Sequence, residues 1–297
     1  MGSQADIVRR EFGASDKKRD AGLTTPDTIE RFDNIQYGED PVWNILDVYR
    51  PKDKKGCKLP VIVSVHGGGW VYGDKEVYQF YCMSLAEHGF AVVNYTYRLA
   101  PENKYPKSIE DTNDVFEWVL RHSEEYDFNT DYIFGVGDSA GAHMLGLYSA
   151  ICTNDDCAKL YAFKVPNGFK PTAIALNCGK YSMNDEMKND KMTSSLVNEY
   201  LPNGGTDEEY KLIDVVRYIT EDYVPVFYMT CTGDFLEKQA PLLGAKLIEK
   251  HIPHEFHYYG DSKNVLGHVF HCNVRLDDAK KCNKDECDYF KKFIKED

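Results

Sequence analysis

The sequence has no apolar stretch long enough to cross a membrane, and its first residues, MGSQADIVRR, lack the apolar core of a signal peptide. It also has no basic stripe, because 48 acidic residues outnumber 35 Lys and Arg and give a formal net charge of −13. Such a chain repels polyanions. We therefore expect no membrane partner and no nucleic-acid partner. The odd number of cysteines, nine, predicts free thiols and a cytoplasmic location.

The cysteines and histidines are not spaced as in common metal sites. Cys152 and Cys157 are five residues apart, as are Cys282 and Cys287, whereas zinc sites use tighter pairs. The histidines at 254 and 257 lie three residues apart in a predicted strand, so that their side chains point to opposite faces. We therefore predict neither a metal nor a cofactor.

The sequence does contain a regular alternation of strand and helix patterns. Residues 31–38 and 43–51 alternate apolar and polar positions and predict a β-hairpin. Further strands are predicted at 61–65, 90–97, 132–136, 172–177, 226–232 and 254–259. Helices are predicted at 76–88, 108–123, from 139 or 140 onward, at 238–250 and at 277–295. This order predicts an α/β fold with a mostly parallel, twisted sheet, helices on both faces and antiparallel strands at one edge.

We predict a single domain over residues 1–297, with an N-terminal arm at about 1–30 that is either a helix or loose. Residues 180–222 interrupt the alternation and are polar and rich in Met, Asn and Tyr. A long insertion of this kind is more often a cap than a plain loop. We expect it to limit the size of the substrate and to be dispensable for folding, because the sheet closes without it.

The stretch IFGVGDSAGAHM places Ser139 between Gly137 and Gly141, after a predicted strand and before a predicted helix. This is the Gly-x-Ser-x-Gly elbow, in which a sharp turn strains the serine backbone and lifts its hydroxyl into a cleft. The residues two positions away must be small because the turn brings their backbones together. The helix N-terminus favours negative charge. Ser139 is therefore predicted to be a nucleophile.

A second glycine-rich motif, HGGGW at 66–70, also follows a buried strand. Its three glycines let backbone N–H groups approach a ligand closely, as an oxyanion-binding loop requires. Trp70, Tyr72 and Tyr181 are candidates for lining a substrate pocket, although each could equally belong to the core. Of these, we assign Trp70 and Tyr72 to substrate binding.

The chain resembles the hormone-sensitive-lipase-like branch of the α/β-hydrolases, which includes acetyl esterases and small carboxylesterases. The resemblance rests on three motifs that occur in this order: HGGGW, YRLAPE and GDSAGAH. The segments LDVYRP and HGGGW…GDK are also similar to feruloyl-esterase and kynurenine-formamidase relatives. The resemblance covers about residues 42–294, and Ala142 stands where many members have glycine. It implies an α/β-hydrolase fold, a structural role for the His66 side chain, and oxyanion donors at the backbone N–H groups of Gly68, Gly69 and Ala140.

In this fold the acid and the base of a catalytic triad follow the serine in the order Asp or Glu, then His. Asp234 comes directly after a predicted strand, whereas Asp222 precedes that strand and Glu237 falls in the next helix. His268 lies on the loop after the last strand, and His271 is the alternative. We assign Asp234 as the acid and His268 as the base.

These residues predict a serine carboxylesterase that acts on small acyl esters, such as acetylated sugars or aryl esters, through an acyl-enzyme. The same triad could instead hydrolyse an amide, as in a formamidase. A catalytically silent binding module is a third possibility, but such modules typically lack the serine or the histidine. Nothing in the sequence indicates the oligomeric state.

Overall fold

The computed structural model describes residues 2–183 and 191–295. Its centre is an eight-stranded sheet with the order β1-β2-β4-β3-β5-β6-β7-β8. The antiparallel pair β1 (Ile29–Gln36) and β2 (Ile45–Pro51) forms one edge, and β2 pairs antiparallel with β4. The remaining strands are mutually parallel: β3 (Leu59–Val65), β4 (Ala91–Tyr95), β5 (Phe128–Asp138), β6 (Ala173–Asn177), β7 (Val226–Cys231) and β8 (His254–Tyr259). The predicted mostly parallel sheet with an antiparallel edge is confirmed.

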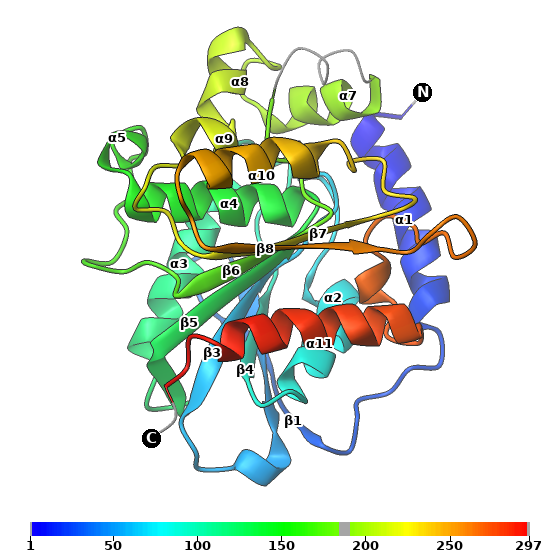
Figure 1. Cartoon of the computed structure of the whole chain (residues 1–297), viewed down its shortest axis with the longest axis vertical. Coiled ribbons are helices and arrows are strands. Elements are labelled where there is room, and N and C mark those ends of the chain that lie inside the picture. The colour runs from blue at the N-terminus through cyan, green and yellow to red at the C-terminus, as the bar shows by residue number, and fades with distance from the viewer. Residues whose placement is uncertain (1, 184–190, 296–297) are drawn as a thin grey trace.

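Helices cover both faces of this sheet (Figure 1). One face packs against α3 (Lys107–Arg121), α4 (Ala140–Thr153) and α10 (Gln239–Glu249), and the other against α2 (Lys75–Ala86) and α11 (Asp277–Lys291). In β3, Val61 and Val63 point into the first layer while Ile62 points into the second. Burial on both faces explains why the parallel strands read as continuous apolar runs. Short elements complete the order: η1 (Lys52–Lys54), α5 (Asp155–Ala158) and η2 (Phe270–Cys272).

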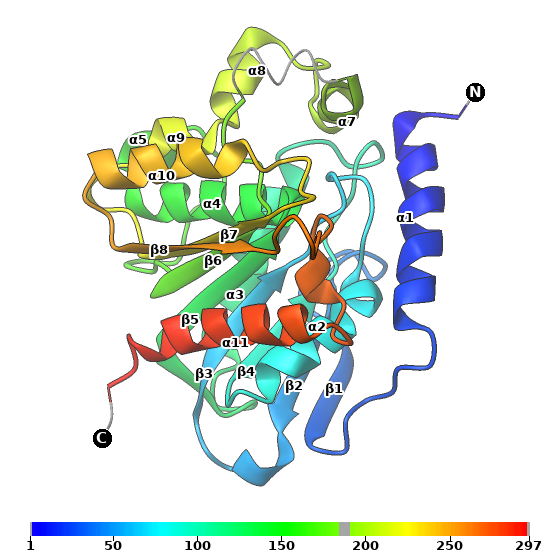
Figure 2. The same cartoon turned by 45° about the vertical axis from the view of Figure 1, so that its right-hand side comes forward.

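The first residues form a helix, α1 (Gln4–Asp20), rather than a loose arm. Ser3 caps it and Asp6 completes a capping box, which satisfies N–H groups that the first turn leaves free. The helix runs along one side of the molecule, from near α7 to near α2 (Figure 2). Its N-terminal N–H groups, at Gln4 and Ala5, donate to the carboxylate of Glu199. This helix is therefore a packed part of the fold.

The connection between β6 and β7 contains α7 (Lys191–Tyr200), α8 (Asp207–Leu212) and α9 (Val215–Tyr218). Part of the predicted cap, residues 184–190, lies outside the described residues. Val197, Tyr200, Ile213 and Val215 are buried in the same core cluster as the inner face of α4. The segment therefore packs into the core, and its dispensability for folding stays a prediction. Among the described residues, none of the helices is both long and apolar enough to span a membrane.

Candidate active site

Ser139 stands at the junction of β5 and α4, where it is the residue that precedes the first helical turn. Its φ of 52° and ψ of −115° place a residue with a side chain in a strained region. A Cβ atom on Gly137 would lie 2.7 Å from the carbonyl oxygen of Gly141, and one on Gly141 would lie 2.0 Å from that of Val65. The turn therefore requires glycine at both positions.

A continuous chain of hydrogen bonds links three side chains that come from three different loops. The Oγ atom of Ser139 lies 3.0 Å from Nε2 of His268, which follows β8. The Nδ1 atom of His268 lies 2.6 Å from Oδ1 of Asp234, which follows β7. The two other carboxylates considered as the acid lie elsewhere. Asp222 precedes β7, and Glu237 accepts a hydrogen bond from the Tyr258 hydroxyl. The arrangement can relay a proton away from the serine hydroxyl.

Asp234 is held as a charged acceptor. Burial would raise its pKa, but hydrogen bonds from His268, the Thr230 hydroxyl and the backbone N–H of Leu236 outweigh burial and lower the pKa below its usual value. The Thr230 contact measures 2.7 Å and the Leu236 contact 2.8 Å. The carboxylate is thus fixed in one orientation toward the imidazole.

The loop that carries His268 is attached to the end of β7. The backbone N–H of Gly233 donates to the carbonyl of Leu266, and the Thr232 hydroxyl accepts from the N–H of Leu266. The Cys231 thiol lies 3.2 Å from the carbonyl oxygens of both Leu266 and Gly267. Sequence reasoning missed Cys231 and Thr230. Their position in the strand just before the acid is the only sequence signal that could have indicated them.

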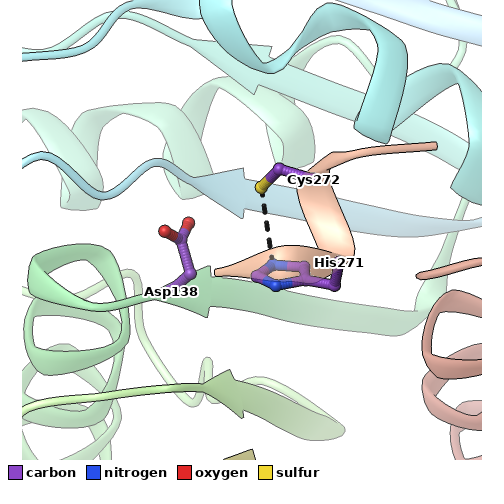
Figure 3. A group of neighbouring side chains, drawn as sticks. All are labelled: Asp138, His271 and Cys272. Carbon is purple, nitrogen blue, oxygen red and sulfur yellow. Dashed lines mark hydrogen bonds between the residues drawn. The ribbon is translucent and has the colours of Figure 1, made fainter. Parts of the chain in front are cut away.

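His271 lies outside this chain of hydrogen bonds. It is fully buried beside Cys272, with Nε2 3.6 Å from the thiol sulfur, and Asp138 lies nearby (Figure 3). Burial, together with the charge of His268, lowers the pKa of His271 to about 3. The geometry therefore favours His268 over His271 as the partner of Ser139.

The HGGGW loop approaches the serine with its backbone. Gly68 has a φ of 113° and Gly69 a φ of 61°, and a Cβ on Gly68 would lie 2.1 Å from the carbonyl oxygen of Tyr72. Gly68, Gly69 and Ala140 line the same cleft as Ser139. Their backbone N–H groups donate to no acceptor among the described residues. They can therefore donate to a substrate oxygen.

A buried network ties this loop to the elbow. The Tyr78 hydroxyl donates to Asp138 at 2.8 Å, and the N–H of Gly67 lies 3.2 Å from the other carboxylate oxygen. Burial raises the pKa of Asp138 to about 6, although these hydrogen bonds oppose it. His66 stacks on Tyr97 with ring centres 4.0 Å apart, and burial lowers its pKa to about 4. Sequence reasoning missed Asp138, although it occupies the variable position of the elbow motif.

A cleft of about 420 Å³ opens over Ser139. Its wall is mainly apolar and includes Phe235, Leu236 and Phe270. Helices outside the sheet complete it: α1 contributes Phe12, Ser15, Asp16 and Arg19, and α7 contributes Met192, Thr193 and Leu196. The contribution of α1 was not foreseen, because nothing in the sequence indicates where an N-terminal helix docks.

The three aromatic residues singled out from the sequence have different surroundings. Trp70 lines the cleft but is nearly enclosed, stacking on Tyr200 and donating its indole N–H to His143 at 3.2 Å. Tyr72 also lines the cleft, and its hydroxyl donates to Asp16 of α1 at 2.8 Å. Tyr181 is buried outside the cleft lining and belongs to the core.

Sequence comparisons show the family of this chain and its similarity to several esterases. A family model described as BD-FAE matches residues 46–247. Esterase LipC of Mycobacterium tuberculosis is 30% identical over 152 residues, which cover 51% of this chain and 36% of that protein. An acetyl esterase of Salmonella choleraesuis is 28% identical over 230 residues, which cover 72% of this chain and 68% of that protein. The chain thus spans only about a third of the length of the first relative.

Solved structures agree on the fold. Esterase B from Lactobacillus rhamnosis superposes with a TM-score of 0.89 at 23% identity, over 98% of this chain and 95% of that chain. The carboxylesterase EstE1, cloned from a metagenomic library, gives a TM-score of 0.77 at 18% identity, over 98% of both chains. At such identities the likeness shows the fold alone, and it confirms the predicted α/β-hydrolase fold.

Proposed function

The chain belongs to the BD-FAE family of α/β-hydrolase esterases, and from this premise we propose that it is a serine carboxylesterase for small acyl esters. The observation that carries the proposal is the hydrogen-bonded chain from Ser139 through His268 to Asp234, which faces the cleft. The distances match those at which a base accepts a proton from a nucleophile.

In the first step His268 accepts the hydroxyl proton as Ser139 attacks the ester carbonyl carbon. The buried Asp234 carboxylate keeps the proton of the resting imidazole on Nδ1 and stabilises the imidazolium that forms. His268 then gives the proton to the departing alcohol. Water, deprotonated by the same imidazole, hydrolyses the acyl-enzyme and regenerates the serine.

The negative charge that develops on the carbonyl oxygen needs fixed donors. We assign this role to the backbone N–H groups of Gly68, Gly69 and Ala140, which line the cleft around Ser139. The N-terminus of α4 adds a favourable partial charge at the same place. Apart from the substrate and one water molecule, the proposed reaction uses only groups of the chain.

We expect the enzyme to prefer small substrates. Each added methylene of an acyl chain gains about 0.8 kcal/mol on burial, whereas overpacking a closed wall costs about 1 to 3 kcal/mol. We therefore expect acyl groups of about two to four carbons to be preferred. Tyr72 and Trp70 are proposed to contact the substrate. The nine free cysteines favour a cytoplasmic location.

A substrate panel tests the proposal. Purified protein and Ser139→Ala are compared on p-nitrophenyl esters of rising chain length, acetylated xylo-oligosaccharides, feruloyl esters and N-formylkynurenine. We expect short esters to be cleaved, and removal of the nucleophile to lower kcat by about 10⁴-fold or more. If only N-formylkynurenine is cleaved, the protein is an amidase and not an esterase. Full activity of Ser139→Ala would refute the assignment of Ser139 as the nucleophile.

A further inference from the structure

A cysteine stands beside two members of the hydrogen-bonded chain. The sulfur of Cys178, a carboxylate oxygen of Asp234 and a ring nitrogen of His268 all lie within 4.8 Å of one another. Cys178 follows β6, so each of the three residues comes from the end of a different parallel strand. Cys178 is 1% exposed, whereas the His268 side chain is 15% exposed and lines the cleft. The group is therefore buried on one side and open on the other.

These three donors are the ones that borderline and soft divalent cations prefer. Thiolate, imidazole and carboxylate bind zinc at about 2.0 to 2.3 Å, which places ligand atoms of a tetrahedral ion about 3.3 to 3.8 Å apart. A separation at the 4.8 Å limit must shrink by about 1 to 1.5 Å, and the 2.6 Å between Nδ1 of His268 and Oδ1 of Asp234 must lengthen by about 0.7 Å, which side-chain rotation can supply. We propose that Cys178, Asp234 and His268 bind Zn²⁺ or Cd²⁺ and that this binding inhibits the enzyme. The proposed inhibition rests on the proposed esterase function, whereas the proposed metal binding does not.

The inhibition follows from the two nitrogens of the imidazole. Nδ1 faces Asp234 at 2.6 Å, and Nε2 faces Ser139 at 3.0 Å. A cation on the Asp234 side takes the lone pair of Nδ1, so the ring proton moves to Nε2. Nε2 then has no lone pair with which to accept the serine proton. The thiol proton of Cys178 leaves to solvent as the metal–sulfur bond forms.

Burial, together with Cys231 and the charge of Asp234, raises the pKa of the Cys178 thiol well above its usual value, so a cation has to displace the thiol proton. The Cys178 sulfur contacts the Met229 sulfur at 3.8 Å, which is a weak interaction. A second cluster, Asp138 with His271 and Cys272, has the same types of donor (Figure 3). Its histidine, His271, is fully buried, whereas the His268 side chain is 15% exposed and lines the cleft. We therefore place the cation at Cys178 and use Cys272 as the matched control.

The first experiment titrates ester hydrolysis with ZnCl₂. Wild type should lose activity at sub-millimolar zinc and regain it when EDTA is added. Cys178→Ala should keep its basal rate but need at least about tenfold more zinc, since even indirect metal contacts are worth 10- to 100-fold in affinity. Cys272→Ala should be inhibited like wild type. Equal inhibition of Cys178→Ala, or resistance of Cys272→Ala, would overturn the assignment.

The second experiment measures binding without activity. CdCl₂ is added to Ser139→Ala, and the ultraviolet charge-transfer band of a cadmium thiolate is recorded. One equivalent should produce the band, and combining Ser139→Ala with Cys178→Ala should remove it. Absence of the band from Ser139→Ala would refute the site. If the band appears while wild type hydrolyses no ester, the metal site stands and the proposed function fails.

Discussion

The floor of the cleft and its roof are built in different ways. The floor consists of the loops that carry Ser139, Asp234 and His268, and each follows a strand of the sheet and is fixed by short hydrogen bonds. The roof consists of α1 and α7, which lie outside the sheet and meet where the N-terminus of α1 donates to Glu199. Side chains whose positions are set by the sheet can perform chemistry that tolerates little displacement. The side chains that α1 and α7 direct into the cleft can vary without displacing these loops, although both helices also pack into the core.

The same contrast appears in the forces involved. The roof is held partly by exposed ion pairs such as Arg9 with Glu102, at 2.6 Å, of the kind that contribute only about 0 to 1 kcal/mol. In the floor Asp234 is buried and Ser139 and His268 are partly buried, so leaving one of their hydrogen bonds unmade costs more free energy than it does at the surface. We therefore expect substitutions in the floor to change rates strongly, and substitutions in the roof to change which substrate is preferred.

The largest effect is expected in the floor, at the base. His268→Ala should lower kcat by about 10⁴-fold, because Ser139 loses its proton acceptor. His271→Ala, three residues away in the core, should cost stability but leave kcat of the folded protein within about tenfold. Steady-state kinetics on a p-nitrophenyl ester measures both. A reversed order of the two variants would show that the histidines were assigned wrongly.

The next effect concerns Asp138, beneath the floor. Burial raises its pKa from 3.8 to about 6, so the folded protein binds this proton more tightly than the unfolded chain. The resulting stabilisation is complete below the unfolded value and is lost as pH rises through about 6.

Asp138→Asn removes this titration. The difference in free energy of unfolding between the variant and wild type should therefore move by about 2 to 3 kcal/mol in favour of the variant between about pH 4 and pH 7. Urea unfolding at several pH values measures it. A difference that stays constant with pH would contradict the burial argument.

A smaller effect is expected at Cys231, which holds the His268 loop through two carbonyl groups. Cys231→Ala should lower kcat about three- to tenfold with KM nearly unchanged, because loss of the thiol contacts costs about 1 kcal/mol in loop positioning. Cys231→Ser should restore part of the rate. Cys282→Ala removes another fully buried thiol, in α11, and serves as the control. Equal losses in Cys231→Ala and Cys282→Ala would indicate a general packing defect.

The smallest effect should come from the roof. Leu196 of α7 lines the cleft next to Gly69. Leu196→Ala should leave kcat for acetyl esters within about threefold and raise the relative kcat/KM for longer chains by about fourfold per methylene, the equivalent of about 0.8 kcal/mol. A series of p-nitrophenyl esters measures this profile. An unchanged profile accompanied by a large loss of kcat would mean that α7 belongs to the floor.

The sequence by itself determined the sheet, the family and the candidates for chemistry. Strands buried on both faces must be apolar along their length, and a strand-to-helix elbow with a strained serine requires glycines at 137 and 141. These are local constraints of sterics and periodicity, so they are readable in one chain. The resemblance to hormone-sensitive-lipase-like esterases agrees with the family match over residues 46–247.

Only the tertiary structure decided which distant groups meet. The choice between His268 and His271 depends on which ring reaches Ser139, and three residues of spacing do not reveal it. The docking of α1 over the cleft, the burial of the α7 to α9 segment in the core, and the placement of Cys178 beside Asp234 likewise depend on contacts between elements far apart in the chain. Such contacts leave no periodic signal, because burial and hydrogen bonding across loops depend on three-dimensional distance and not on spacing along the chain.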